Sequence, residues 1–93
     1  MYVTYDFEEL KIAEFGTGAL LYGQALLKSD SNGGWFVDEI VFENGHVIHQ
    51  GTPTVLDREM FKAITEVLYN INTVHGREAD SEWADTVSER RAA

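Results

Sequence analysis

Residues 35–50, with the sequence WFVDEIVFENGHVIHQ, decide the fold of this chain. Apolar residues lie on both sides of the Asn44-Gly45 pair. Asn-Gly suits a two-residue type I′ turn, because both central residues of that turn need a positive φ. The stretch therefore predicts a β-hairpin in which Val41 lies opposite Ile48.

This pairing divides the hairpin into two faces, because successive side chains of a strand point to opposite sides. One face is mainly apolar, and we expect it to be buried. Its residues are Phe36, Asp38, Ile40, Phe42, Val47 and His49. The other face mixes apolar and polar side chains, and we expect it to point outward. Its residues are Trp35, Val37, Glu39, Val41, Glu43, His46, Ile48 and Gln50.

Two further strands are expected upstream of the hairpin. Residues 29–34 have the composition of a loop. Residues 18–28 contain helix-favouring Ala, Leu and Gln, but we prefer a strand, because a lone hairpin needs further pairing to be stable. Residues 1–15 are ambiguous. Asp6 and Glu9 fit a helical capping box, whereas the alternating residues that follow favour an extended strand, which we prefer.

Pro53 separates this strand-like half from a helical half. Apolar residues recur at spacings of one, three and four from about Asp57 to Val74, which predicts an amphipathic helix. Asp57 or Thr54 can cap its first turn, and the His75-Gly76 pair suits its end. We expect this helix to lie across the buried face of the hairpin.

Residues 77–93 carry only a thin apolar stripe, made of Trp83 and Val87. They predict a short second helix that docks weakly or orders on a partner. Residues 88–93 are a candidate for a mobile tail.

The whole chain thus predicts one α+β domain over residues 1–93. An antiparallel sheet of three to four strands comes from the strand-rich part, residues 1–51. One long amphipathic helix and a short C-terminal helix come from the helical part, residues 54–93. Hydrophobic residues make up 44% of the chain, which is enough for a packed core.

Composition excludes several classes of function. The chain has no cysteine, so disulfides, thiolate catalysis and cysteine-ligated metals are ruled out. The first ten residues contain no Lys or Arg, which does not fit a secretory signal. We expect a cytoplasmic protein.

Charge indicates the class of partner. Sixteen Asp and Glu against seven Lys and Arg give a net charge of −9. Nucleic acids and anionic membranes attract clustered Lys and Arg, so we expect neither to be a direct partner. A protein with a basic surface is the complementary choice, although acidity also serves solubility.

Catalytic and metal-binding patterns are weak. His46 and His49 are three residues apart, a spacing that converges on a helix but diverges on a strand, and His75 lies far away. Gly16-Thr17-Gly18 lacks the third glycine of a dinucleotide-binding loop. We therefore expect no metal, no cofactor and no catalytic residue.

The outward face of the hairpin remains as the candidate binding surface. Trp and aliphatic side chains at the centre of a surface are typical of interface hot spots, and acids around them select a basic partner. The predicted partner-binding residues are Trp35, Val37, Glu39, Val41, Glu43, His46 and Ile48.

We therefore expect a non-enzymatic acidic protein that docks on a basic protein surface and inhibits or modulates that partner. Phages encode small acidic inhibitors of nucleic-acid-binding proteins, and such an inhibitor is the form we favour, by size and charge alone. The alternative is a structural subunit that self-associates through its sheet face, as a homodimer or in a larger assembly. A small hydrolase is the least favoured class.

Overall fold

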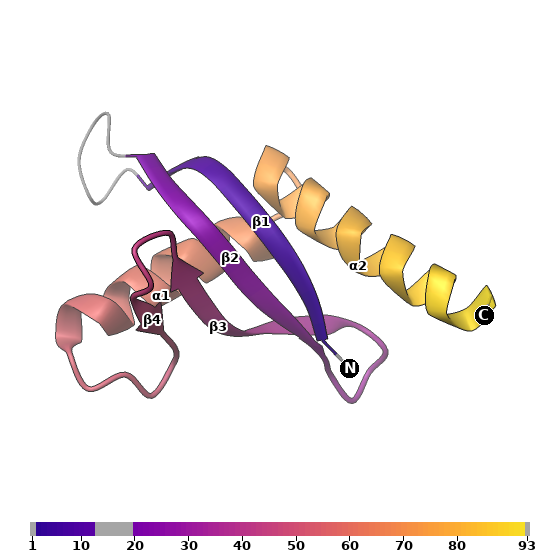
Figure 1. Ribbon diagram of the computed structural model, residues 1–93, viewed down its shortest axis with the longest axis horizontal. Coiled ribbons are helices and arrows are strands. Elements are labelled where there is room, and N and C mark those ends of the chain that lie inside the picture. Colours follow the sequence, from indigo (N-terminus) through magenta and orange to yellow (C-terminus); the bar gives the residue numbers. More distant parts are fainter. Residues whose placement is uncertain (1, 13–19, 93) are drawn as a thin grey trace.

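The computed structural model describes residues 2–12 and 20–92, and within them the chain forms an antiparallel sheet followed by two helices (Figure 1). The four strands lie in sequence order, each beside the next along the chain. The elements are β1 (Tyr2–Lys11), β2 (Leu20–Ser29), β3 (Trp35–Phe42), β4 (Val47–Ile48), α1 (Val55–Tyr69) and α2 (Val74–Ala92). The expected α+β class with an antiparallel sheet is confirmed. The C-terminal helix, expected to be short, is instead the longer of the two helices, with 19 residues.

The two upstream strands form where the sequence favours them. β1 pairs with β2, and β2 pairs with β3, both antiparallel. The strands predicted over residues 1–15 and 18–28 extend into residues 13–19, which lie outside the described residues. The Gly16-Thr17-Gly18 motif lies outside them as well.

One face of the sheet carries the core. Val3, Tyr5 and Phe7 of β1 are buried at alternate positions, as expected for a strand with one buried face. A β-bulge follows Phe7, with Glu9 at φ 54°, and it brings Leu10 back to the buried side.

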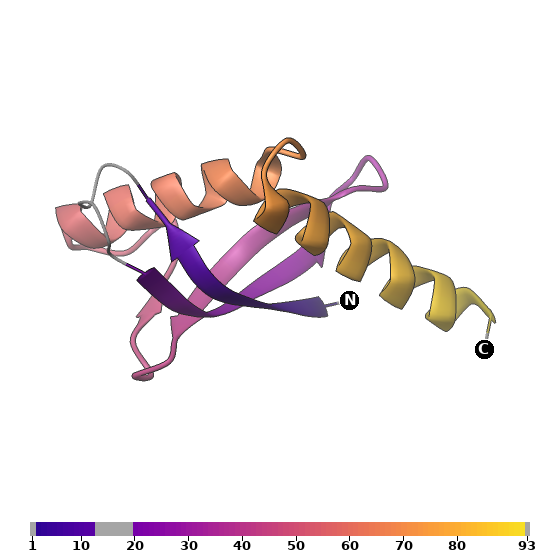
Figure 2. The ribbon, with the colours of Figure 1, turned by 90° about the horizontal axis from the view of Figure 1, so that it is seen from above.

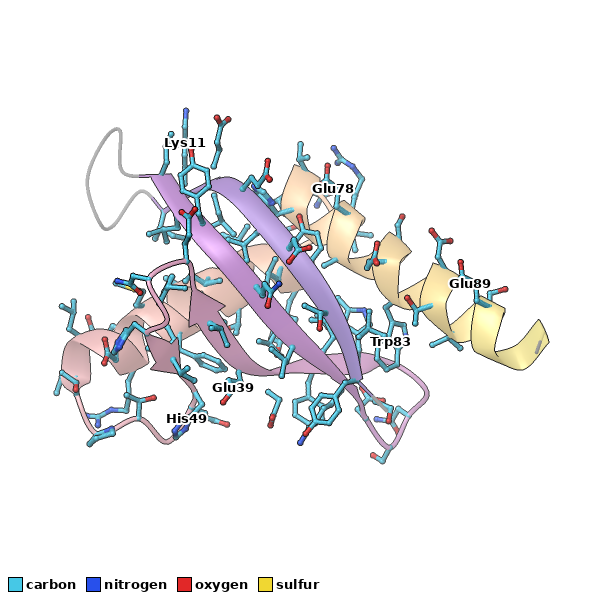
Figure 3. All side chains as sticks on the ribbon, viewed as in Figure 1. Lys11, Glu39, His49, Glu78, Trp83 and Glu89 are labelled. Carbon is cyan, nitrogen blue, oxygen red and sulfur yellow. The ribbon has the colours of Figure 1, made fainter. Side chains whose placement is uncertain are left out.

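Both helices lie on this same side of the sheet (Figure 2). α1 buries Phe61, Ile64 and Leu68 at spacings of three and four, and these side chains belong to one apolar cluster with the buried strand residues. α2 adds Ala79 and Trp83 to the cluster. Figure 3 shows Trp83 between α2 and the sheet, whereas Glu89 points away from the sheet.

The first helix ends five residues earlier than the sequence predicts. α1 ends at Tyr69, and the Thr73 hydroxyl caps α2 by accepting the N–H of Gly76 at 2.9 Å. A side chain at Gly76 would place its Cβ 1.9 Å from the Asn70 carbonyl oxygen. Gly76 is therefore needed for close approach at the helix junction, not for ending the helix that precedes it.

The hairpin turn has a longer loop than predicted. Val41 lies opposite Val47, and the Phe42 N–H donates to the His46 carbonyl at 2.8 Å. Gly45 has φ 91° and Asn44 does not have a positive φ, so the loop is not a type I′ turn. The predicted pairing of Val41 with Ile48 is wrong by one residue.

A β-bulge changes the alternation in β3. Leu26 lies opposite Glu39 but Leu27 lies opposite Val37, so Asp38 is an extra residue in the register. Val37 and Ile40 consequently both face the core.

The bulge and the turn together overturn the expected division of faces. Phe36 and Val47, expected inside, are 39% and 41% exposed. Val37 and Ile48, expected outside, are buried. Ile40 is buried as expected. The reason is that a strand has a period of two, so one inserted or shifted residue exchanges its faces.

Candidate binding surface

The side of the sheet that faces away from both helices is the open face of the molecule (Figure 2). Its side chains alternate with the buried ones along each strand. The open face comprises Tyr2, Thr4, Asp6, Glu8, Lys11, Leu20, Tyr22, Gln24, Leu26, Lys28, Phe36, Glu39, Val41, Glu43 and Val47.

Val41 is at the centre of an apolar patch on the open face. It lies directly opposite Val47 on β4 and opposite Gln24 on β2. Tyr22 and Leu26, two positions to either side of Gln24, are its diagonal neighbours, which are within reach of long side chains. Tyr22 and Val47 are 38% and 41% exposed. We call Tyr22, Leu26, Val41 and Val47 the Val41 patch.

Carboxylates surround the Val41 patch. Asp6 is opposite Gln24 in the register, Glu39 is opposite Leu26, and Glu43 follows at the hairpin turn. None of the three has an ion-pair partner among residues 2–12 and 20–89. The surroundings of the patch therefore carry negative charge that a basic partner could match.

A hollow of about 400 Å³ connects Tyr22 and Val41 of the patch with Asp6 and Glu43. Its lining includes six open-face residues: Asp6, Glu8, Tyr22, Gln24, Val41 and Glu43. Apolar and acidic side chains from β1, β2 and β3 thus share one continuous surface.

Lys28, a basic residue of the open face, is already engaged. Its Nζ lies 3.2 Å from Asp38 Oδ2 and 4.7 Å from the centre of the Tyr2 ring. Hydrogen bonding to Tyr2, and then to Asp38, raises the pKa of Lys28, so the ammonium stays charged. Because Asp38 balances it, Lys28 leaves the acids around the Val41 patch uncompensated.

The seven predicted partner-binding residues are divided between the two sides of the sheet. Glu39, Val41 and Glu43 lie together on the open face. Val37 and Ile48 are 4% and 0% exposed, so their expected outward placement is wrong.

Trp35 and His46 are bound to the helices. The Trp35 ring lies 5.6 Å from the ring of Tyr69 in α1, and its Nε1 donates to Asp80 Oδ1 of α2 at 3.1 Å. His46 Nε2 lies 3.2 Å from Asp57 Oδ2 of α1. A partner-binding role for these seven residues stays a prediction.

The sequence analysis missed the contribution of β1 and β2 to the surface. Asp6, Tyr22 and Leu26 were not singled out, although alternation within each strand could have placed them on one face of it. Only the register shows that Tyr22 and Leu26 neighbour Val41, and that Asp6 lies one strand further across the sheet, opposite Gln24.

The His46–Asp57 pair lies beside a cavity of about 520 Å³. Its lining is mainly apolar and includes Leu21, Phe42 and Met60. Within the described chain, no serine, threonine or lysine lines it, so a hydrolytic nucleophile of those types is not placed near His46.

The described residues contain neither a cluster suited to a metal ion nor a helix suited to span a membrane. No group of three or more His, Asp or Glu side chains there is arranged to hold a metal ion. Neither α1 nor α2 has an apolar stretch long enough to cross a membrane.

Comparisons with known proteins add no relative. No protein-family model matches the chain, and searches of the curated proteins and of the solved structures found no match.

Proposed function

We propose that this chain is a non-enzymatic acidic protein that docks through its open face onto a basic surface of a protein partner and inhibits or modulates that partner. One observation carries the proposal. An exposed apolar patch, centred on Val41, is bordered by the carboxylates of Asp6, Glu39 and Glu43.

The two components of this surface have different roles in docking. The Val41 patch supplies apolar area whose removal from water favours association. The carboxylates supply specificity and faster encounter with a positively charged partner, because charges of opposite sign attract over the distance of a Debye length. An open sheet face can remain stable in water without a partner when it carries polar residues between the apolar ones.

An inhibitor of a nucleic-acid-binding protein is the concrete form that we favour. A nucleic-acid-binding groove is lined by Lys and Arg, and a small acidic surface can occupy it in competition with the nucleic acid. The net charge of −9 and the chain length of 93 residues support this form. Small acidic inhibitors encoded by phages have the same size and charge, and the comparison extends no further.

Self-association through the same sheet face is the second candidate, because the Val41 patch would also suit a homodimer. In a two-fold contact the same patch is used by both copies. A contact centred on Val41 would then bring the acids around the two patches close together, and like charges would oppose it. The charge therefore favours a partner of different sequence.

The test is affinity capture from the native host with the whole chain and two charge-reversed variants. The Glu39→Lys/Glu43→Lys variant alters the open face, and the Glu59→Lys/Glu66→Lys variant makes the same charge change on the exposed side of α1. We expect the first variant to weaken capture of a basic protein about tenfold or more and the second to retain it.

Three outcomes would contradict the proposal. Equal capture by both variants would exclude the open face, and capture that is insensitive to salt would exclude the electrostatic part. A dimer in sedimentation velocity that Val41→Glu dissociates would favour the self-association candidate instead.

A further inference from the structure

The sheet ends in a long edge strand with unpaired backbone groups. β1 and β4 are the two edges, and β1 has ten residues whereas β4 has two. The Glu43 N–H donates to the Tyr22 carbonyl at 3.1 Å, so the backbone of Tyr22 faces β3. Backbone groups alternate between the two neighbours along an antiparallel strand, so Gly23 and Ala25 face β1.

The same alternation fixes the direction of the backbone groups in β1. Phe7 and Tyr5, the partners of Gly23 and Ala25, direct their N–H and C=O groups toward β2. Thr4 and Asp6 therefore direct theirs toward the open edge. No hydrogen bond to either residue's backbone comes from any other part of the described chain. Such an edge is a template for one more strand.

α2 packs alongside this edge strand. Figures 1 and 2 both show α2 running alongside β1 in the opposite direction. The Tyr5 hydroxyl connects the two elements, donating to Glu78 Oε2 at 2.9 Å and lying 2.8 Å from His75 Nδ1. Since the single hydroxyl proton goes to Glu78, His75 Nδ1 carries a proton and donates to the hydroxyl oxygen.

A groove of about 560 Å³ lies between α2 and β1, and its charge is mainly negative. It is lined by Tyr5, Arg77, Glu78, Ser81, Glu82 and Asp85. Glu82 and Asp85 are exposed and have no ion-pair partner within the part of the chain whose side chains are described.

The spacing of the acids fits an added strand. Glu78 and Glu82 are four residues apart on the helix, a rise of about 6 Å. Side chains two residues apart on one face of a strand are separated by about 6.6 to 6.8 Å. Basic side chains at every second position of an added strand can therefore follow the acids of α2.

We infer that β1 accepts an extended, Lys- or Arg-rich segment of a protein partner as a fifth strand, with its basic side chains toward the acids of α2. Recognition combines backbone hydrogen bonds to Thr4 and Asp6 with charge complementarity in the groove. A second copy of this chain is a poor occupant, because its β1 would bring further acids, among them Asp6 and Glu8, to an edge that is already acidic. The inference uses the backbone edge of β1 and the α2 groove, not the side chains of the open face, and it goes beyond the proposed function.

The experiment titrates the whole chain with a synthetic peptide in which Lys and Thr alternate over about nine residues, within the usual range of strand length. Amide hydrogen exchange is followed by NMR. We expect the Thr4 and Asp6 amides to exchange about tenfold more slowly with the peptide bound, since they acquire hydrogen-bond acceptors. The Tyr5 and Phe7 amides should be protected with or without it. Binding that leaves Thr4 and Asp6 unprotected would overturn the inference.

Two peptide controls separate strand pairing from general attraction between charges. A peptide that alternates Glu and Thr should not bind. A Lys and Thr peptide with N-methyl groups on every second backbone nitrogen should lose binding when the methylated edge is the one that pairs with β1. Two such peptides are needed, one methylated at the odd and one at the even positions. The inference would be overturned if both bound as tightly as the unmethylated peptide.

Variants of the chain give a second readout. Thr4→Pro removes an N–H that points outward, a change that edge strands tolerate, and should abolish binding, whereas Thr4→Val keeps the N–H and should retain it. Glu82→Lys/Asp85→Lys should weaken binding about tenfold. The Glu59→Lys/Glu66→Lys variant, matched in charge, should weaken it much less.

The open-face variant distinguishes this inference from the proposed function. Glu39→Lys/Glu43→Lys should leave peptide protection of Thr4 and Asp6 in place, even though it impairs docking through the Val41 patch. Loss of that protection in this variant, with Glu82 and Asp85 intact, would overturn the assignment to the β1 edge.

Discussion

The two faces of the sheet carry similar apolar side chains, but the buried face stabilises the fold and the open face is available for binding. Ile40 and Val41 are neighbours in β3, yet Ile40 is fully buried under the helices and Val41 is only half-buried on the open face. The buried face supplies most of the stability, since its side chains leave water entirely on folding. The open face retains apolar area that folding does not use, and that area is available for binding.

The largest expected contrast between the faces comes from shortening these two neighbours. Ile40→Ala should lower the free energy of unfolding by about 3 kcal/mol, because it leaves a cavity in the core. Val41→Ala should lower it by less than about 1 kcal/mol, because water already reaches that site. Urea unfolding of the two variants measures the difference. Equal losses would mean that the open face is covered in solution.

The helix junction on the covered side should be nearly as sensitive. Gly76→Ala would place a methyl group against the Asn70 carbonyl and should cost about 2 kcal/mol, although Ala favours a helix by about 1 kcal/mol over Gly. Ser88→Ala, at an exposed position of α2, is the control and should be nearly neutral. A Gly76→Ala protein as stable as the parent in thermal unfolding would show that the junction can open without cost.

Removing a hydroxyl from each face should give a smaller contrast that depends on pH. Tyr5→Phe loses the bonds to Glu78 and His75 and should cost about 1 kcal/mol, whereas Tyr22→Phe on the open face should cost little. Burial, and then the Glu78 carboxylate, raises the pKa of Tyr5 above the ordinary tyrosine value of 10.0.

The direction of the pH effect follows from that raised pKa. The folded state keeps the Tyr5 proton when the unfolded state has lost it, so this stabilisation is complete below pH about 10 and is lost as the pH rises further. The stability difference between the parent and Tyr5→Phe should therefore shrink in alkaline urea titrations. A difference that grows above pH about 10 would contradict the bonding arrangement.

The smallest expected effect lies at the bulge that brings Leu10 back to the buried face. Glu9 has φ 54°, which strains an L-residue but not glycine, so Glu9→Gly should raise the free energy of unfolding by about 0.5 kcal/mol. Glu8→Gly makes the same change where φ is not positive and should lower it by about 0.5 kcal/mol. Calorimetry of the two variants checks whether the free energy of unfolding rises or falls. A lower value for both variants would mean that Glu9 does not keep its positive φ in solution.

The hairpin shows how far local sequence signals extend. Asn44-Gly45 correctly indicates a reversal between two strands, but the loop has three residues because Gly45 alone takes a positive φ. The second error comes from Asp38, whose side chain gives no sign that the register skips a residue there. Each error exchanges the faces of part of the hairpin, and together they place Val37 and Ile48 in the core.

The candidate surface was predictable only in part for the same reason. Glu39, Val41 and Glu43 were identified by alternation within β3 and do lie on the open face. Tyr22 on β2 and Asp6 on β1 complete the surface from other strands, and the pairing register that brings them to the same face is a tertiary property.

By itself the sequence determined the acidic charge, the absence of cysteine, the chain reversal at Asn44-Gly45 and the amphipathic character of α1. These properties depend on composition and on local periodicity, which a chain carries whatever it packs against. Only the tertiary structure decided which face of the hairpin is buried and where α1 ends. The physical reason is that strand register and close contacts at a helix junction are set by distant partners, and a shift of one residue is enough to reverse a face.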